Sequence, residues 1–500
     1  MKMTQETDVL KWENVDQVYA DLKSALQAAV QQGQPLHEVE LALWKRVLQI
    51  GHEAFTQFFK LQGTGDMGET VELPDGRLCQ RLQELHARRL VSIFGEFVLT
   101  RTVYGSREGQ KIEFVPLDNR LQLPATIFSY VLQDWDQGFC AEEAFGQAAW
   151  MIERILGLKQ SVDSLEHMNQ HLAQQVQSFR ENRPMPKPEE EGEIMVLGGD
   201  GKGVVMRREE PAPRGHRSTG EKASQKRMAI VGTAYTVARH LRTPEQVLAA
   251  LFGDAQPKMS PRPTPQHKHV WASLPQESED GEVAAVDIVY PWLLNEVAER
   301  NRGLVKEMVC VQDGQESLWE ACERHLPQSQ RTNILDVLHV TPRLWKAAHV
   351  FCQEGSAAAE QFMRERLLKV LQGRSDLVVR GLREMASKRQ LTGAKKKTIA
   401  SVCAYLEANR QRMHYDVYLG KGYPIASGAL EGACRHLIKD RLERAGMHWT
   451  AAGAQAMLDV RSTLVNGDWE RYQTYYRERE IHTLYPYRQL VDGLSFGQAA

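Results

Sequence analysis

Residues 193–207 read "EIMVLGGDGKGVVMR", and this stretch decides the fold of the 500-residue chain. It is an apolar run that reaches Gly-Gly-Asp, and a second apolar run, "KRMAIVGTAYTVA" at 226–238, follows beyond a polar loop. Both runs have strand character. A probable third strand and the helical stretch 290–303 come next, before two more strands at 305–314, "VKEMVCVQDG", and 332–340, "TNILDVLHV". This order predicts an α/β domain with a mixed sheet and flanking helices.

Two aspartates stand at the ends of these predicted strands. Asp200 follows "IMVLGG", and Asp313 follows "MVCVQ". Each precedes a glycine, so an ordinary tight turn is the alternative to a functional role. Of the three other Asp-Gly pairs of the chain, one follows a proline, one lies in a polar segment and one lies in the C-terminal tail. Asp200 and Asp313 differ from them because they follow strands that are expected to be buried.

A third acid lies in residues 427–449, "SGALEGACRHLIKDRLERAGMHW". On a helix the apolar residues share one face, and Glu431 lies at its edge, with Arg435 and Lys439 on the wet side. Two acids on neighbouring strands and one on a following helix can converge, which is a ribonuclease H-like layout. Three carboxylates are hard oxygen ligands, suited to Mg²⁺. A pair of such ions could serve an in-line phosphoryl transfer.

Bulk properties limit the class of protein. The net charge is −2, so any DNA binding must come from local basic patches. The seven scattered cysteines form no CxxC pair, which argues against a disulfide framework or a zinc ribbon and favours a reducing cytoplasm. We find no apolar run long enough for a membrane span and no secretory signal pattern. The expected location is cytoplasmic and nucleoid-associated.

Composition suggests a division of the chain. Residues 1–182 are expected to be mainly helical, and the Pro- and Glu-rich segment 183–193, which includes "RPMPKPEEE", is expected to be a linker. Residues 194–342 and 416–464 would form the catalytic domain, 343–415 a helical insertion and 465–500 a tail. The stretch at 36–60 predicts one long amphipathic helix, for a bundle or for a dimerising coiled coil.

Residues 140–176 have the outline of a helix-turn-helix. Gly157 would end the first helix, and Ser161 could cap the second. The second helix, "SVDSLEHMNQHLAQQ", contains no Lys or Arg. Reading of DNA bases and simple helical packing therefore both remain open for this region.

At these residues the chain resembles a DDE-type insertion-sequence transposase, most closely of the ISKra-type family. The resemblance covers most of the chain and is carried by "LGGDGKGVVMR", "VQDGQESLW", "ILDVLHVTPRLW" and above all by residues 405–462, "YLEANRQRMHYDVYLGKGYPIASGALEGACRHLIKDRLERAGMHWTAAGAQAMLDVRS". It implies that Asp200, Asp313 and Glu431 are the catalytic and metal-binding triad. The 117 residues between Asp313 and Glu431 fit the helical insertion of that family.

The resemblance implies metal-dependent cleavage and strand transfer at the ends of a mobile element. Two Mg²⁺ ions are implied, for which Mn²⁺ can substitute. The expected partner is double-stranded DNA, both the terminal inverted repeats and the target, bound by a homodimer or a larger oligomer. Two alternatives stay open: a ribonuclease H-like nuclease or resolvase without strand transfer, and a catalytically silent DNA-binding protein.

Further residues are candidates for accessory roles. Asp336 and His339, at the end of the last predicted strand, could help at the scissile phosphate, or His339 could be an ordinary hydrogen-bonded histidine. Several cations could grip the DNA backbone or simply be solvated. The cations expected to bind DNA are Lys202, Arg207, Arg208, Lys226, Arg227, Lys395, Lys396, Lys397, Arg435 and Lys439. Trp449 and the tyrosines of the tail are expected to pack into a core rather than stack on a base.

Overall fold

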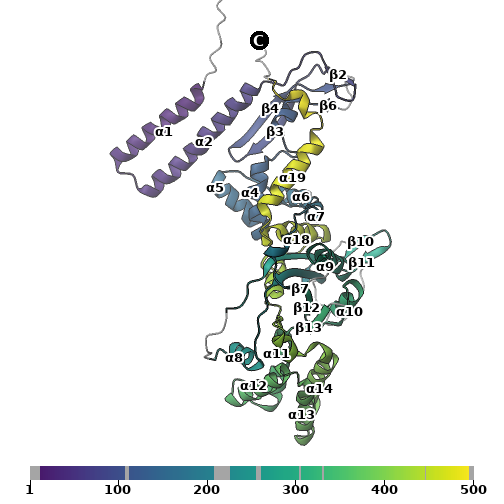
Figure 1. Cartoon of the computed structure of the whole chain (residues 1–500). Coiled ribbons are helices and arrows are strands. Elements are labelled where there is room, and N and C mark those ends of the chain that lie inside the picture. Colours follow the sequence, from purple (N-terminus) through teal and green to yellow (C-terminus); the bar gives the residue numbers. More distant parts are fainter. Residues whose placement is uncertain are drawn as a thin grey trace, which may run out of the picture. The chain divides into compact units, whose positions relative to one another are not determined.

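The computed structural model describes residues 12–106, 112–207, 226–254, 261–302, 306–328, 331–444 and 446–494. The chain divides into two compact units, whose elements are labelled in Figure 1. The first unit combines Met1–His171 with Glu470–Ala500, and the second unit is Leu172–Trp469. The segments predicted to form the α/β domain lie entirely in the second unit.

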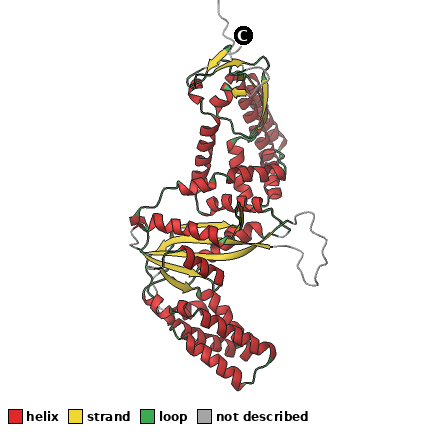
Figure 2. Cartoon of the chain, turned by 90° about the vertical axis from the view of Figure 1, so that its right-hand side faces the viewer, coloured by secondary structure: helices red, strands yellow, loops and turns green. Residues whose placement is uncertain are grey.

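A mixed five-stranded sheet forms the centre of the second unit (Figure 2). Its strands are β7 (Ile194–Val205), β8 (Lys226–Val237), β9 (Gln266–Ser273), β12 (Glu307–Gln312) and β13 (Arg331–Leu335). They lie in the order β13-β12-β7-β8-β9. The β7-β8-β9 part is antiparallel, and β12 runs parallel to both β7 and β13. The predicted mixed sheet is confirmed.

Alternation along β7 and β12 divides two hydrophobic cores between the faces of this sheet. Met195 and Cys310 belong to the core under α9 (Val286–Arg300) and α10 (Glu316–His325). Val196 and Val309 belong to the core formed with the helices that follow β13. The face of each side chain is therefore fixed by its parity along the strand.

Two consecutive glycines let helices approach β7 from both faces. A Cβ at Gly198 would lie 3.2 Å from Leu430 Cδ2, and a Cβ at Gly199 would lie 2.7 Å from the Tyr290 hydroxyl. Gly199 pairs with Gly232 of β8, where a Cβ would meet Val289 of α9 at 2.6 Å. The two glycines of the "LGGD" motif are thus required for close packing of the helices on β7.

Helices cover the segment between β13 and the third acid. They are α11 (Val337–Phe351), α12 (Ala357–Leu371), α13 (Ser375–Lys388), α14 (Gly393–Ala408) and α15 (Tyr415–Gly420). The first of these helices begins at Val337, so the prediction of a strand over 332–340 is wrong beyond Leu335. The reason is local: the Asp336 carboxylate accepts a hydrogen bond from Leu338 N at 2.7 Å and so caps α11.

Side chains satisfy the backbone at both edges of the sheet. On β9, Gln455 of α18 (Ala451–Val465) accepts from Leu274 N at 2.9 Å, and Asn466 accepts from Val270 N at 2.9 Å. At the opposite edge, the Tyr415 hydroxyl donates to Leu335 O at 2.7 Å. These side chains take the place of additional strands.

The predicted linker, 183–193, is tied to the second unit rather than free. Arg183 donates to Glu296 of α9 at 2.7 Å, and Glu296 also pairs with His269 at 2.8 Å. Glu191 accepts from Arg300 at 2.8 Å, and both side chains are buried. The only regular structure within this segment is the short 3₁₀ turn Pro188–Glu190, among the residues described. A buried ion-pair network therefore replaces the flexible connection that the prolines suggested.

The first unit contains more β-structure than its sequence led us to expect. Its helices are α1 (Glu13–Gln32), α2 (Leu36–Gln62), α3 (Pro116–Leu121), α4 (Tyr130–Glu142), α5 (Phe145–Leu156), most of α6 (Val162–Ala173) and most of α19 (Trp469–Leu484). Its strands are β1 (Thr70–Glu72), β2 (Leu78–Arg81), β3 (His86–Ser92), β4 (Gly95–Arg101), β5 (Tyr104–Gly105) and β6 (Ile112–Phe114). The prediction of a mainly helical region missed these strands, of which β3 and β4 form a tight hairpin in the register Ser92–Gly95.

The helix-turn-helix outline corresponds to α5 and α6. Gly157 ends α5 in the left-handed conformation, and the Ser161 hydroxyl accepts from Ser164 N at 3.0 Å, as the sequence predicts. Asn169 of α6 donates to Gln137 of α4 at 3.0 Å. The first predicted helix begins at Phe145 rather than at residue 140, since α4 ends at Glu142. In the described parts of the chain, no helix is both long and apolar enough to cross a membrane.

Candidate metal centre and nucleic-acid interface

The registers of three parallel strands, when extended past their last paired residues, line up three aspartates. Cys310 pairs with Leu197, and the same offset places Asp313 across from Asp200. Gln312 pairs with Leu335, and the same offset places Asp336 across from Asp313. Residues in register on neighbouring strands point to the same face of a sheet. Asp200 lies within β7, which continues to Val205, so the prediction that Asp200 ends its strand is wrong.

Glu431 reaches this row from the helix that packs on the same face. It lies in the first turn of α16 (Gly428–Cys434), whose Leu430 contacts the Gly198 position of β7. One turn later, the Cys434 thiol lies 3.1 Å from Asp200 Oδ2 and donates to it. Burial, followed by the charge of Asp336, raises the pKa of Glu431, and Asp200 adds to this shift. The helix therefore faces the row of aspartates.

His339 lies among the acids. Its Nδ1 is 3.4 Å from Asp313 Oδ1. Ligand atoms of Asp336, His339 and Glu431 also lie within 4.8 Å of one another, a spacing that one metal ion could bridge. The tightest group thus combines the two accessory candidates with one member of the predicted triad. Asp313 contacts this group through His339, and Asp200 lies beside it through Cys434.

Asp336 is fully buried and holds two segments together. One oxygen caps α11, and the other accepts from the backbone N–H of Ser427 at 3.0 Å and from the Ser427 hydroxyl. Ser427 directly precedes α16. Asp336 therefore fixes the starts of α11 and α16 relative to each other, in addition to any contact with a metal.

Burial and neighbouring carboxylates together raise the pKa values of two groups in this centre. The pKa of Glu431 is raised, first by partial burial and then by the charge of Asp336, while His339 lowers it and Asp200 raises it further. Burial, followed by the charge of Asp313, raises the pKa of Tyr405, whose ring lies 4.4 Å from the Arg343 guanidinium. A divalent cation would relieve the repulsion among the acids.

Tyr405 forms a wall beside Asp313. A Cβ at Gly314 would lie 2.6 Å from the Tyr405 ring, so only glycine fits at this position. Tyr405 belongs to α14, in the helical insertion. The glycine of the Asp-Gly pair at 313 is thus required by packing against Tyr405.

Three residues of this centre were missed by sequence reasoning: Ser427, Cys434 and Tyr405. Ser427 stands directly before a helix, which is a familiar capping position. Cys434 is three residues after Glu431, so its side chain shares that face of the helix. Both signals were readable, whereas the approach of Tyr405 depends on how the insertion packs.

The third-acid helix is shorter and less regular than predicted. After Cys434 the chain forms a π-helical turn, Arg435–Lys439, and then a short α17 (Asp440–Leu442). Arg441 is fully buried, and its guanidinium lies 5.0 Å from the Trp449 ring. The π turn interrupts the α-helical periodicity that the prediction assumed for the whole stretch.

The predicted DNA-binding cations fall into separate groups. Lys202 and Lys226 both lie near Glu443, at 3.7 and 3.9 Å, across the β7–β8 hairpin. Arg227 pairs with Glu282 at 2.8 Å. Arg207 donates to His448 O at 3.2 Å. Arg208 lies outside the described residues.

The remaining predicted cations are exposed. Arg435 pairs loosely with Asp440 at 3.5 Å, and Lys439 follows it on the same side of the chain. Lys395, Lys396 and Lys397 lie in the first turn of α14, near the end opposite to Tyr405. At 1.5 Å per residue, Lys396 is roughly 14 Å along the helix from Tyr405. The structure thus places Arg435 and Lys439 just beyond Glu431, and the lysine triplet at a distance.

The aromatic residues behave as expected. Trp449 is buried and donates to Leu442 O at 3.2 Å. In the first unit, Tyr472, Tyr476 and Tyr485 are buried. Core packing is confirmed for these four residues.

Comparisons with known proteins return little. No protein-family model and no curated protein matches the chain. Among solved structures, the chain is similar to one described as "Drosophila P element transposase strand transfer complex". The sequence identity is 8%, the match covers 72% of this chain and 84% of that chain, and the TM-score is 0.24. A likeness at this level identifies neither a family nor a function.

Proposed function

We propose that this protein is a DNA transposase that uses Asp200, Asp313 and Glu431 for metal-dependent phosphoryl transfer. The proposal is supported by the register of β7 and β12, which leads to Asp200 and Asp313 when it is extended three residues beyond the Leu197–Cys310 pair, and by the packing of α16, which carries Glu431, against β7. The sheet order β13-β12-β7-β8-β9, followed by a helical insertion before the third acid, supports a ribonuclease H-like domain of the DDE type.

The side chains fit a hard divalent cation. Asp200, Asp313 and Glu431 offer carboxylate oxygens, which Mg²⁺ and Mn²⁺ prefer. Burial, followed by the charges of Asp336 and Asp200, raises the pKa of Glu431, and a bound cation would favour its ionised form. When bound, the ions would polarise the attacking and leaving oxygens of the phosphodiester. By the chemistry of their oxygen donors, the three acids are suited to such ions, and the ligand atoms of Glu431, Asp336 and His339 lie within 4.8 Å of one another.

The protein's own groups would supply positioning and proton transfer. His339, 3.4 Å from Asp313, could accept the proton of the attacking water or 3′-hydroxyl. Asp336 holds the helix that carries Glu431 in place through Ser427. Arg435 and Lys439 follow Glu431 and would hold the phosphate chain next to the scissile bond.

Single substitutions test the triad. Asp200→Asn, Asp313→Asn and Glu431→Gln should each abolish Mg²⁺-dependent cleavage of DNA that carries the ends of the element, while DNA binding stays near normal. Glu320→Gln is the control, because Glu320 is exposed on α10, against the opposite face of the sheet. Cleavage that survives in any of the three variants would remove that residue from the triad.

A strand-transfer assay separates this proposal from a nuclease. Ends cut in advance, which carry a free 3′-hydroxyl, should be joined to target DNA in Mg²⁺ or Mn²⁺. A hydrolytic nuclease would cut intact ends but give no joined product. A silent DNA-binding protein would do neither. Because two ends must be held together, the active species should be a dimer or a larger assembly on DNA, measurable by light scattering of the complex.

A further inference from the structure

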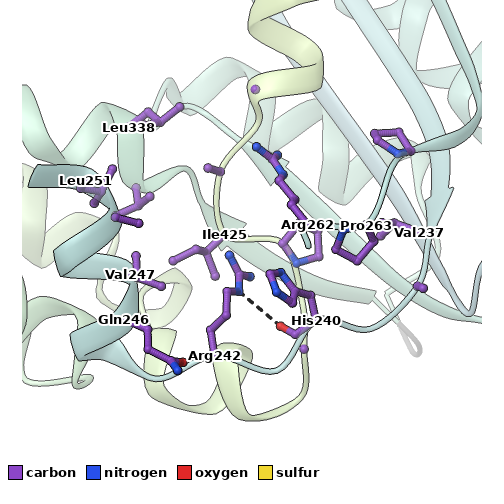
Figure 3. A pocket seen from close by; sticks show the side chains of 18 of the residues that line it. Val237, His240, Arg242, Gln246, Val247, Leu251, Arg262, Pro263, Leu338 and Ile425 are labelled. Atoms are coloured by element: carbon purple, nitrogen blue, oxygen red, sulfur yellow. Dashed lines mark hydrogen bonds between the residues drawn. The ribbon is translucent and has the colours of Figure 1, made fainter. Parts of the chain in front are cut away.

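A cavity lies beside the candidate metal centre in the same unit. Its volume is about 410 Å³, within the range of roughly 300–1,000 Å³ typical of small-molecule sites. Figure 3 shows it between β8, α8 (Pro244–Phe252) and the loop that leads to α16. Its lining includes Leu338, next to His339, and Gly428, three residues before Glu431. Three residues of helix rise about 4.5 Å, so the cavity adjoins the acids.

The charge of this cavity is one-sided. Arg242 and Arg262 line it, and its lining contains no Asp or Glu. Within the residues that the structure describes, neither arginine forms an ion pair with a carboxylate. Both arginines line the same cavity, and burial, followed by the charge of Arg262, lowers the pKa of Arg242. Two cations facing one cavity without an acid are suited to an anion.

The two arginines differ in freedom. Arg242 is held by backbone carbonyls, donating to Tyr423 O at 2.7 Å and to His240 O at 3.2 Å (Figure 3). Arg262 is exposed, and one of its Nη atoms lies 3.9 Å from the Cβ position of Gly428. The first thus forms a fixed positive wall, and the second can close over a ligand near the start of α16.

The rest of the cavity is apolar. Val247 and Leu251 of α8 lie opposite Ile425 and Leu338, and Pro263 forms part of the rim (Figure 3). Gln246 faces the cavity, but its side-chain oxygen accepts from Thr243 N at 2.8 Å within the cap of α8. A ligand that fits must therefore pair an anion with a flat apolar group.

We infer that this cavity binds one nucleotide, with its phosphate between Arg242 and Arg262 and its base against Val247, Leu251 and Ile425. Guanidinium planes and apolar side chains are common surfaces for an unpaired base. The nucleotide could be a unit extruded from the DNA strand next to the cleaved bond, or a free nucleotide. The role in DNA processing rests on the proposed function, whereas the binding chemistry does not.

Binding measurements with the full chain test this inference. Fluorescence anisotropy in Ca²⁺ would compare a labelled single strand of about twelve nucleotides with strands that carry one abasic position. Removing the bound base should weaken binding at least about fivefold, because one stacked base contributes roughly 1–3 kcal/mol. Free deoxynucleoside 5′-monophosphate and inorganic phosphate are the competing probes. Competition by the monophosphate without an abasic effect would identify a free nucleotide as the occupant.

Two variants locate the site. Leu251→Trp fills the mouth of the cavity, and Arg262→Gln removes its exposed cation; both side chains are exposed, so folding is not at risk. Each should erase the difference between intact and abasic strands, or the competition by monophosphate. Arg374→Gln, an exposed arginine outside the cavity, should leave both unchanged.

Three results would overturn the inference. They are equal binding of intact and abasic strands together with no competition by monophosphate, an undiminished base effect in Leu251→Trp, and an equal loss in Arg262→Gln and Arg374→Gln. None of these measurements needs DNA cleavage. A chain that binds nucleotides through this cavity but never cuts DNA would contradict the proposed function alone, and a chain that cuts DNA with neither base-dependent binding nor competition by monophosphate would contradict this inference alone.

Discussion

Two clusters of acids in the second unit show opposite electrostatic designs. Glu296, on α9, is buried with Arg183, His269 and Arg300 around it. Burial alone would raise its pKa, but the hydrogen bond from His269 and the surrounding positive charges lower it to about 2. Glu431, beside Asp336 and Asp200, has a raised pKa instead. The first cluster is neutralised by its own side chains, whereas the second needs positive charge from outside.

This contrast distinguishes a structural ion pair from a candidate functional site. Each cluster contains a buried acid, Glu296 in the first and Asp336 in the second, whereas Glu431 is exposed beside Asp336. The difference lies in the partners: two arginines and a histidine against one histidine. The following predictions test whether the difference has the expected consequences.

The largest effect should be on activity in the second cluster. Glu431→Gln should lower Mg²⁺-dependent DNA cleavage at least about 10⁴-fold, equivalent to roughly 5.5 kcal/mol of lost transition-state stabilisation. Single-turnover cleavage rates measure the loss. Glu296→Gln, assayed below its unfolding temperature, should cleave at nearly the wild-type rate. Equal losses in both variants would mean that the two clusters do not differ in function.

The first cluster should dominate stability. Glu296→Ala leaves Arg183 and Arg300 buried with fewer acids, which should lower the free energy of unfolding by about 3–5 kcal/mol. Denaturant unfolding, monitored by Trp fluorescence, measures the change. Glu299→Ala, on the same helix but largely exposed, is the matched control and should change stability little. A loss below 1 kcal/mol in Glu296→Ala would show that the network is not structural.

A third buried acid, in the first unit, provides an intermediate case. Asp136 is fully buried, and Gln160 donates to both of its oxygens, at 2.8 and 2.9 Å. Burial raises the pKa of Asp136 to about 7, and the amide only partly opposes this. Its contribution to stability is therefore complete at pH values below the unfolded pKa and is lost as the pH rises through about 7.

The pH dependence of the first unit should follow from this sign. Between pH 4 and pH 8, the titration of Asp136 should lower the free energy of unfolding by about 2–4 kcal/mol. Asp136→Asn should remove this part of the dependence and be the more stable protein at pH 8. Thermal unfolding of both proteins at several pH values measures the difference. Parallel curves for wild type and variant would contradict the assigned pKa.

The smallest effect concerns the cation itself. Mg²⁺ at ten times its dissociation constant should stabilise the wild-type protein by about 1.4 kcal/mol, and Glu431→Gln by less. Without the ion, Glu431→Gln should be slightly more stable than wild type at pH 7, and this difference should shrink as the pH falls, because a group with a raised pKa destabilises only when ionised. Scanning calorimetry with and without Mg²⁺ measures both. Equal stabilisation of the two proteins would place the ion elsewhere.

The central sheet was largely predictable because its strands are apolar runs with clear ends. β7, β8 and β12 were all expected, and so was the helix that became α9. The segment after Leu335 was not, although Asp336 followed by Val337, Val340 and Leu344 has the cap and the spacing of a helix. Short apolar runs are compatible with the period of a strand and with that of a helix. Here the helix cap at Asp336 is the feature that distinguishes them.

The candidate site was predictable in its residues but not in its geometry. Apolar context singled out Asp200 and Asp313, but the register that aligns them depends on strand pairing, which no local pattern contains. In the first unit, the alternating stretch of β3 and β4 was overlooked among helices. The ion pairs of Arg183 and Glu191 could not be predicted from the sequence either, because a segment rich in prolines and acids resembles a linker.

The side chains that occupy the outer strands of the sheet restrict how this protein can associate. Because Gln455 and Asn466 satisfy β9, and Tyr415 satisfies β13, neither border offers a ready template for a foreign strand. A second copy of the chain is therefore hindered from adding a strand to the central sheet at these positions. If copies assemble on DNA, contacts at these two borders have to be made by side chains.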